Sequence, residues 1–275
     1  MQKNLYKNSY DLLQNDLKNK ILLLDGAMGT MIQQENLTAD DFGGEKYEGC
    51  NDYLVLQRPD VIKNIHKKYL EAGSDIIETN SFGALDIVLK DYDLEDTVFE
   101  MNKKAAELVN EAIAEYRSEH PEVTRNLYVA GALGPSNKSI SVTGGVTFEE
   151  LIHTYYTAVS GLMAGGVDLI LFETIQDTRN LKAAYLGLKK AMEENYTVPL
   201  MLSFTIESTG TTLAGQTADA FYYAVNHMNP FSVGLNCATG PEFMTQFLKT
   251  LNNISNTYIS VYPNAGLPNE DGEYE

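Results

Sequence analysis

One stretch of the sequence indicates the fold most clearly, because it combines a helix end, a glycine stop, an apolar strand and a polar strand end. It reads Ala164-Gly165-Gly166-Val167-Asp168-Leu169-Ile170-Leu171-Phe172-Glu173-Thr174. A shorter version occurs earlier, as Glu71-Ala72-Gly73-Ser74-Asp75-Ile76-Ile77-Glu78-Thr79. Each copy leads from a helix into an Asp-led strand that ends in Glu-Thr. Two copies of one helix-to-strand transition predict repeated βα units.

Short apolar runs recur along the rest of the chain. Most are continuous rather than alternating, which is typical of parallel strands that are covered on both faces. We expect strands at 21–25, 75–80, 127–133, 168–173, 199–205, 232–236 and 258–262. We expect helices at 59–72, 94–118, 147–164, 178–194, 217–228 and 241–252, and a helical extension within 1–20.

The helix boundaries have local signals. Pro59 opens one helix and Gly73 follows its end, as first-turn proline and C-terminal glycine do. Thr147 is followed three residues later by Glu150, which is the capping-box pattern. These signals support the alternation of strands and helices.

Repeated βα units with right-handed crossovers form either an open doubly wound sheet or a closed barrel. A TIM-type (β/α)8 barrel needs eight units, and the sequence offers seven strand candidates before a final loop. The length per unit and the polar strand ends favour the barrel. We interpret residues 1–275 as one α/β domain, with 1–20 as an N-terminal extension and the eighth β/α unit missing from this chain.

Composition excludes several classes of protein. The 275 residues carry a formal net charge of −18, which argues against a nucleic acid or an anionic membrane as partner. No apolar run is long enough to span a bilayer, and the polar segment 1–20 lacks the apolar core of a signal peptide. With only Cys50 and Cys237, a disulfide framework is not the organising principle, and we expect a cytoplasmic protein.

Polar residues follow most of the expected strands. In α/β barrels, functional side chains collect at these C-terminal strand ends. They predict a site for a small polar molecule, and phosphate is a poorer guess because the ends are acidic and no phosphate-binding loop motif is present. Gly26 and Gly29 either allow the backbone to contact a ligand or are needed only for the backbone conformation of the turn. The strand-end residues are Asp25 to Thr30, Glu78 to Asn80, Gly131 to Asn137, Glu173-Thr174, Thr205 with Glu207, Asn236-Cys237 and Asn264.

Three of these residues have competing interpretations. Cys237, at a strand-to-helix junction, is either a small buried apolar residue or a ligand. A cysteine nucleophile is disfavoured because no histidine lies near a predicted strand exit. Glu173 either braces the next loop or serves as counter-ion to a substrate ammonium group. For Glu78, at the equivalent repeat position, we favour the bracing role.

Several motifs together resemble one family, the homocysteine S-methyltransferase domain. The cobalamin-dependent methionine synthase branch is the closest match, because of Asp41-Phe42, Gly44-Glu45 and Gly272-Glu273-Tyr274. The resemblance runs from about residue 18 to the end. Its motifs are Leu24-Asp25-Gly26-Ala27-Met28-Gly29-Thr30-Met31-Ile32-Gln33, Asp75-Ile76-Ile77-Glu78-Thr79-Asn80, Gly234-Leu235-Asn236-Cys237 and Pro263-Asn264-Ala265-Gly266-Leu267-Pro268-Asn269.

The resemblance implies a barrel that holds Zn²⁺, which binds the thiol of homocysteine. The thiolate is the nucleophile, and an unperturbed thiol with a pKa of about 8.5 is mostly protonated at neutral pH. Metal coordination would deprotonate it, and the thiolate would take a methyl group from methylcobalamin to give methionine. The cobalamin, recharged from methyltetrahydrofolate, would arrive on another module, because no Asp-x-His-x-x-Gly motif occurs here.

The resemblance also assigns residues. Cys237 would be a catalytic residue and a zinc ligand, and Asn264 would lie beside the metal as a further ligand. Glu173 would receive the substrate's amino group, and backbone N–H groups around Gly29 and Thr30 its carboxylate. Asp25 and Asn236 would line the pocket.

The chain departs from the family pattern in one major respect. The family's adjacent cysteine pair, in a Gly-Gly-Cys-Cys-Gly motif, has no counterpart here. We expect an incomplete zinc site and no methyl transfer by this chain alone, and a dimer formed through unpaired strand edges. The alternatives are a non-catalytic remnant or binding module, and a sibling methyltransferase that uses betaine or S-methylmethionine. The loops at 47–52, which contains Cys50, and 137–147 are shorter than usual in the family.

Overall fold

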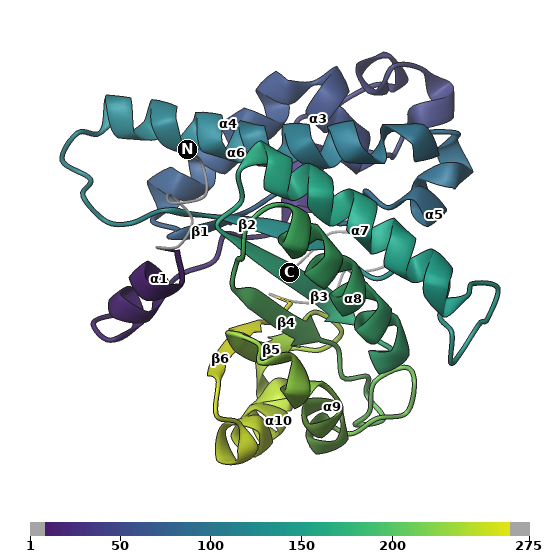
Figure 1. The fold of residues 1–275 in the computed structure, drawn as a ribbon. Helices are drawn as coiled ribbons and strands as arrows, with labels where there is room; N and C mark the ends of the chain where they lie inside the picture. Colours follow the sequence, from purple (N-terminus) through teal and green to yellow (C-terminus); the bar gives the residue numbers. More distant parts are fainter. Residues whose placement is uncertain (1–8, 265–275) are drawn as a thin grey trace.

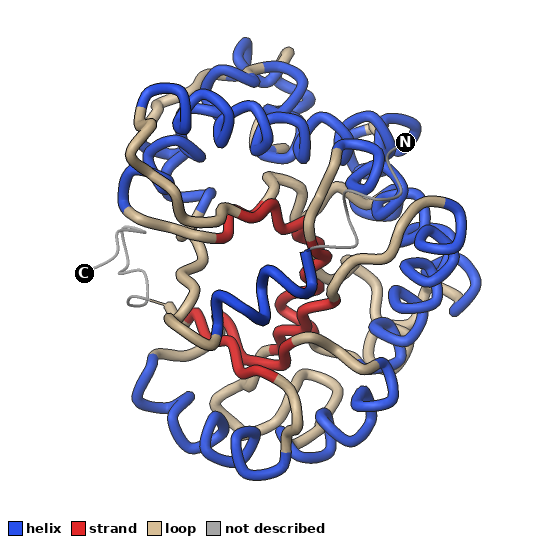
Figure 2. Tube along the Cα trace, turned by 60° about the vertical axis from the view of Figure 1, so that its left-hand side comes forward, coloured by secondary structure: helices blue, strands red, loops and turns tan. Residues whose placement is uncertain are grey.

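The structure is a computed structural model that describes residues 9–264. Six parallel strands lie in the order in which they occur along the chain, and helices alternate with them (Figure 1). The strands are β1 (Ile76–Glu78), β2 (Tyr128–Leu133), β3 (Leu169–Ile175), β4 (Leu200–Phe204), β5 (Ser232–Asn236) and β6 (Tyr258–Tyr262). The sheet curls into an open ring, so the α/β, TIM-type architecture expected from the sequence is confirmed (Figure 2).

The long helices lie outside the ring, and α7 packs between α6 and α8. The helices are α1 (Ser9–Leu17), α2 (Met28–Gln34), α3 (Leu54–Gln57), α4 (Pro59–Ala72), α5 (Asp86–Leu89), α6 (Val98–Glu119), α7 (Phe148–Gly165), α8 (Thr178–Glu194), α9 (Ala218–Val225) and α10 (Pro241–Ile254). Short 3₁₀ turns are η3 (Ala39–Phe42), η4 (Glu45–Tyr47), η5 (Asn51–Tyr53), η6 (Lys90–Tyr92), η7 (Glu95–Thr97) and η8 (Asn226–Met228). No helix within residues 9–264 is both long and apolar enough to cross a bilayer.

The capping signals in the sequence match the helix boundaries. Gly73 takes a left-handed φ of 105° just after α4. Thr147 and Glu150 form the reciprocal capping box before α7. The predicted helix at 94–118 starts later than expected, because residues 95–97 form the 3₁₀ turn η7 before α6 begins.

The predicted strand at 21–25 is wrong as a full strand. Only Leu24 forms a bridge, with Ile76 of β1. Backbone bonds to β1 continue through Leu23 and Asp25, but among the described residues nothing pairs with the segment's other edge. Because only one edge of this segment is hydrogen-bonded, its side chains stay accessible to solvent: Ile21 is 83% exposed and Leu23 is 54% exposed.

Two hydrophobic clusters separate the inside of the ring from its outside. Leu169 and Leu171 of β3 point inward, whereas Ile170 and Phe172 belong to the outer cluster under the helices. This alternation is the normal period of a strand. The next inward position on β3 is Glu173, which therefore emerges inside the mouth of the ring.

Helix α1 closes the opposite, N-terminal end of the ring, and Figure 2 shows it lying across the strands. Its Leu13 is fully buried against the inner cluster. The Tyr128 hydroxyl donates to Asp16 over 2.7 Å, and Ser9 Oγ lies 3.4 Å from the Asp168 carboxylate. With this end filled, the mouth at the C-terminal strand ends is where a ligand can enter.

Candidate active site

Three carboxylates gather at the C-terminal ends of the strands. The carboxylate of Asp25 accepts the backbone N–H of Glu78 at 3.1–3.2 Å, which holds the segment after Leu24 against β1. Glu173 is 8% exposed on β3. Among the residues that the structure describes, no Lys, Arg or His side chain forms an ion pair with Asp25, Glu78 or Glu173. In the described part of the chain, these three carboxyl groups therefore have no cationic partner.

Burial raises the pKa of Glu173 to about 7, and a hydrogen bond from Tyr262 partly opposes this rise. Burial likewise raises the pKa values of Asp25 and Glu78 well above their ordinary range, and the charge of Glu173 raises both further. Isolated buried carboxylates hold protons because their charged form is poorly solvated. A cationic ligand at this position would favour the charged form.

Glu78 does not brace a neighbouring loop in the described part of the chain. Its carboxylate accepts no hydrogen bond there, and the negative charges of Glu173, Asp25 and Cys237 all raise its pKa. The bracing role that the repeat favours is therefore not seen for Glu78, which faces the other acidic groups instead.

Cys237 lies at this same site, half-buried and just after β5. Its Sγ accepts a hydrogen bond of 3.2 Å from Asn236 Nδ2. Burial raises the pKa of the thiol, the bond from Asn236 lowers it, and the negative charge of Glu173 raises it again. The sulfur therefore lies among polar groups, within electrostatic reach of Glu173, and is not packed into hydrocarbon.

Asn236 is fully buried and joins three elements. Its Oδ1 accepts hydrogen bonds from the backbone N–H of Thr174 at 3.0 Å and from Ser203 Oγ at 2.7 Å. Its Nδ2 donates to Thr174 Oγ1 at 2.8 Å and to Cys237 Sγ. The amide thus links the ends of β3, β4 and β5.

The backbone around these residues is strained. Thr174, Cys237 and Ala238 have φ values of 53°, 52° and 57°, in the left-handed region that β-branched residues in particular avoid. The register between β3 and β4 shifts between Phe172 and Ile175, which is a bulge that contains Glu173. Bulges and strained residues concentrate at functional sites.

Two contributing residues were not predicted from the sequence. Tyr262, the last residue of β6, places its hydroxyl 3.4 Å from Glu173 Oε2. Ser203 is fully buried in β4 beneath Asn236. The available signal was that Ser203 is the one polar residue between Leu200 and Phe204, and an inward serine in an apolar strand suggests a polar partner.

The remaining predicted residues lie at the same end of the ring but form fewer contacts. Gly29 is exposed and Thr30 half-buried, both in the first turn of α2. Asn264 is half-buried, two residues beyond β6, and its side chain forms no hydrogen bond with other described residues. The motif positions 265–269 and 272–274 lie outside the described residues.

Gly26 and Cys50 have packing explanations. A Cβ on Gly26 would come within 2.9 Å of the Tyr69 ring, so a larger residue there would require that ring to shift. Gly29 has no such neighbour. Cys50 is 3% exposed in the outer core, and burial raises the pKa of its thiol to about 11.

The loop that follows β2 is fixed to the start of α8. The carboxylate of Asp177 accepts Ser139 Oγ at 2.7 Å and the backbone N–H of Ser141 at 2.9 Å. Asn180 Oδ1 accepts the backbone N–H of Ile140 at 2.9 Å. This loop is therefore held in one place beside the end of β3.

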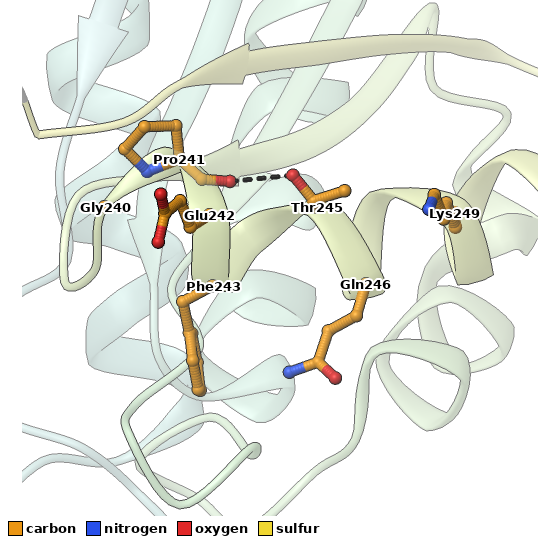
Figure 3. A pocket seen from close by; sticks show the side chains of 7 residues that line it. All are labelled: Gly240, Pro241, Glu242, Phe243, Thr245, Gln246 and Lys249. Carbon is orange, nitrogen blue, oxygen red and sulfur yellow. Dashed lines mark hydrogen bonds between the residues drawn. The ribbon is translucent and has the colours of Figure 1, made fainter.

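A separate groove runs along α10, lined by Gly240, Pro241, Glu242, Phe243, Thr245, Gln246 and Lys249 (Figure 3). It contains none of the predicted site residues. Within residues 9–264, no three His, Cys, Asp or Glu side chains are grouped so that they could hold a metal ion. Of the cysteine ligands expected for zinc, this part of the chain therefore contains Cys237 alone, and no complete metal site is formed there.

Comparison with known proteins gives one family and one group of structures. Residues 22–275 match the family described as homocysteine S-methyltransferase. The metallated form of the homocysteine methyltransferase MmuM from Escherichia coli is similar in structure, with a TM-score of 0.78, 23% identity, and coverage of 93% of this chain and 88% of that one. The oxidised form has a TM-score of 0.78 and 23% identity, with 92% and 86% coverage. The apo form has a TM-score of 0.72 and 23% identity, with 93% and 86% coverage.

Proposed function

This chain belongs to the homocysteine S-methyltransferase family, and we propose that its barrel mouth binds homocysteine and presents the substrate thiol for methyl transfer, which gives methionine. The observation that carries the proposal is the buried Glu173, which has no cationic partner among the described residues and lies within electrostatic reach of the Cys237 sulfur. An α-amino acid brings an ammonium group that supplies the missing charge.

The other site residues have roles that fit the two ends of an amino acid. Backbone N–H groups around Gly29 and Thr30, in the first turn of α2, would receive the substrate carboxylate. Burial and the charge of Glu173 raise the pKa values of Asp25 and Glu78, and a bound ammonium group would favour their charged forms. With the ammonium group at Glu173, the side-chain sulfur would extend toward Cys237.

The proposed methyl donor is methylcobalamin, carried by another module and recharged from methyltetrahydrofolate on a folate-binding module. The support is the resemblance of the strand-end motifs to the methionine synthase branch. A sibling reaction with betaine or S-methylmethionine uses the same thiol site, so it is the alternative within the family. A non-catalytic binding module is the alternative outside it.

Zinc is also a proposal. Cys237 is offered as one of its ligands and Asn264 as a second, and the metal would supply deprotonation of the substrate thiol. The described residues do not by themselves make up a metal site. Cys237 and Asn264 would therefore need further ligands to hold the metal.

The first experiment measures L-homocysteine binding to the purified chain by isothermal titration calorimetry. We expect binding by the wild type and at least a ten-fold loss for Glu173→Gln, because the substitution removes the charge that pairs with ammonium. The matched control is Asp168→Asn, which changes a half-buried carboxylate just before the opposite end of the same strand. Equal affinities for the two variants would contradict the proposal.

The second experiment identifies the donor. Homocysteine is incubated with the zinc-supplemented chain and, in turn, with methylcobalamin, betaine or S-methylmethionine, and methionine is measured by mass spectrometry. Methionine from methylcobalamin supports the proposed donor, and methionine from either other compound supports a sibling reaction. Homocysteine binding without methionine from any donor is the result expected for an incomplete zinc site, and the binding-module alternative predicts it as well.

A further inference from the structure

The Asn236 side chain has no hydrogen-bonding capacity left for a substrate. A primary amide offers two acceptor positions on oxygen and two donor hydrogens on nitrogen. The oxygen already accepts from Thr174 and Ser203, and the nitrogen donates to Thr174 and Cys237. Because the residue is also fully buried, it has no surface that a ligand could touch.

Two of these bonds hold Thr174 in an unfavourable conformation. A β-branched residue at a φ of 53° is strained, and such geometry persists only where the surroundings fix it. Asn236 bonds both the backbone N–H and the hydroxyl of Thr174. Since Thr174 directly follows Glu173 in the bulge of β3, these bonds set the direction in which Glu173 leaves the strand.

The remaining bonds of Asn236 act on the other side of the site. Nδ2 holds Cys237 Sγ at 3.2 Å, and Cys237 itself lies at a φ of 52°. Oδ1 is anchored below by Ser203 of β4. One amide therefore fixes both the residue after the carboxylate and the sulfur.

We propose that Asn236 is a positioning residue, which sets the turn that carries Glu173 and the sulfur of Cys237 relative to each other without contacting the substrate. This inference rests on the proposed function, because the geometry that it fixes is the distance between an ammonium site and a thiol site. The resemblance implies that Asn236 lines the substrate pocket. In the role proposed here, Asn236 instead acts on the substrate indirectly, through Thr174 and Cys237.

The first test compares Asn236→Ala with Asn102→Ala. Asn102 is equally buried, and its Nδ2 donates to the carbonyls of Ala84 and Val98 on the outer side of the fold. Homocysteine affinity is measured by calorimetry, and thermal unfolding confirms that each variant folds. We expect a loss of about ten-fold or more for N236A and less than two-fold for N102A. If N236A does not fold, Asn236→Asp with Asn102→Asp as control keeps the side-chain shape and removes the donors.

The second test separates positioning from contact. In an Asn236→Ala or Asn236→Asp background, Thr174→Gly removes the Cβ that makes a φ of 53° costly, whereas Thr174→Ala keeps it. Both substitutions remove the hydroxyl. If Asn236 acts by holding this backbone, the double variant with glycine binds homocysteine several-fold more tightly than the one with alanine. A direct contact by Asn236 predicts no difference between the two.

The outcomes distinguish this inference from the function on which it rests. A wild-type chain that does not bind homocysteine overturns both. If the wild type binds and the Asn236 variants bind as their Asn102 controls do, the proposed function stands and the positioning role is wrong. Glycine and alanine double variants of equal affinity also overturn the positioning role.

Discussion

At the scale of single residues, the buried carboxyl groups of the site make the free energy of unfolding depend on pH. The folded pKa of Glu173, about 7, lies above its unfolded value of about 4.3, so the native state binds more protons between these two values. The contribution of Glu173 to stability therefore falls as pH rises through this window. We expect the wild type to have a higher urea midpoint at pH 5.5 than at pH 8.

Glu173→Gln should remove much of that pH dependence, because glutamine does not ionise. Glu149→Gln, an exposed carboxylate at the start of α7, should leave it unchanged. The measurement is urea unfolding of all three proteins at both pH values. A wild type that gains stability between pH 5.5 and pH 8 would count against buried, unpaired carboxylates.

Gly234 makes a second prediction at this scale. A Cβ on this residue would lie 1.9 Å from the backbone carbonyl oxygen of Ser260 on β6, and backbone cannot move aside as a flexible side chain can. We expect Gly234→Ala to destabilise the protein by about 2 kcal/mol or more. Gly29→Ala, which meets nothing within 4 Å, should change stability by less than about 1 kcal/mol. Chemical denaturation that ranks the two variants equally would refute the predicted clash.

The site could be predicted only in part from single residues. Glu173 and Cys237 end recognisable apolar strands, and strand ends of parallel sheets meet at one edge, so their proximity follows from the pattern. The contacts of Ser203 and Tyr262 depend on strand register and on which face each residue takes. The bulge after Phe172 changes that register. The bulge depends on how β3 pairs with β4, and the sequence of β3 alone does not reveal this pairing.

At the scale of elements, helix α1 closes the N-terminal end of the ring although it lies outside the residues that match the family. Leu13 is fully buried against the inner cluster. We expect Leu13→Ala to destabilise the protein by roughly 2–4 kcal/mol, since it leaves a cavity in an apolar site. Asn15→Ala, on the exposed side of α1, is the matched control. Similar urea midpoints for both variants would mean that α1 contributes no packing.

The elements also differ in how well their sequence specifies them. Helices α4 and α7 carry their own start and stop residues, Pro59, Gly73 and the Thr147–Glu150 pair, so their boundaries follow from local chemistry. The segment 21–25 has a strand-like composition, but a strand needs a partner along its edges. Its apolar run therefore predicts an extended segment more reliably than it predicts a paired strand.

At the scale of the whole molecule, the described sheet does not close. β6 pairs with β5 alone among the described strands, and Val261 is 44% exposed on it. Unpaired strand edges tend to pair with other chains. We expect concentration-dependent self-association by light scattering, and we expect Val261→Lys to reduce it. Leu186→Lys, at an exposed site on α8, should not. A monomer at all concentrations, with cooperative unfolding, would contradict this expectation.

A crystal structure of the chain with L-homocysteine would show directly whether Glu173 and Cys237 bind the two ends of the substrate. We expect the ligand ammonium to lie within hydrogen-bonding distance of Glu173, the carboxylate to meet the first turn of α2, and the sulfur to point toward Cys237. Homocysteine bound in the α10 groove, or bound at the barrel mouth with its sulfur away from Cys237, would contradict the claim.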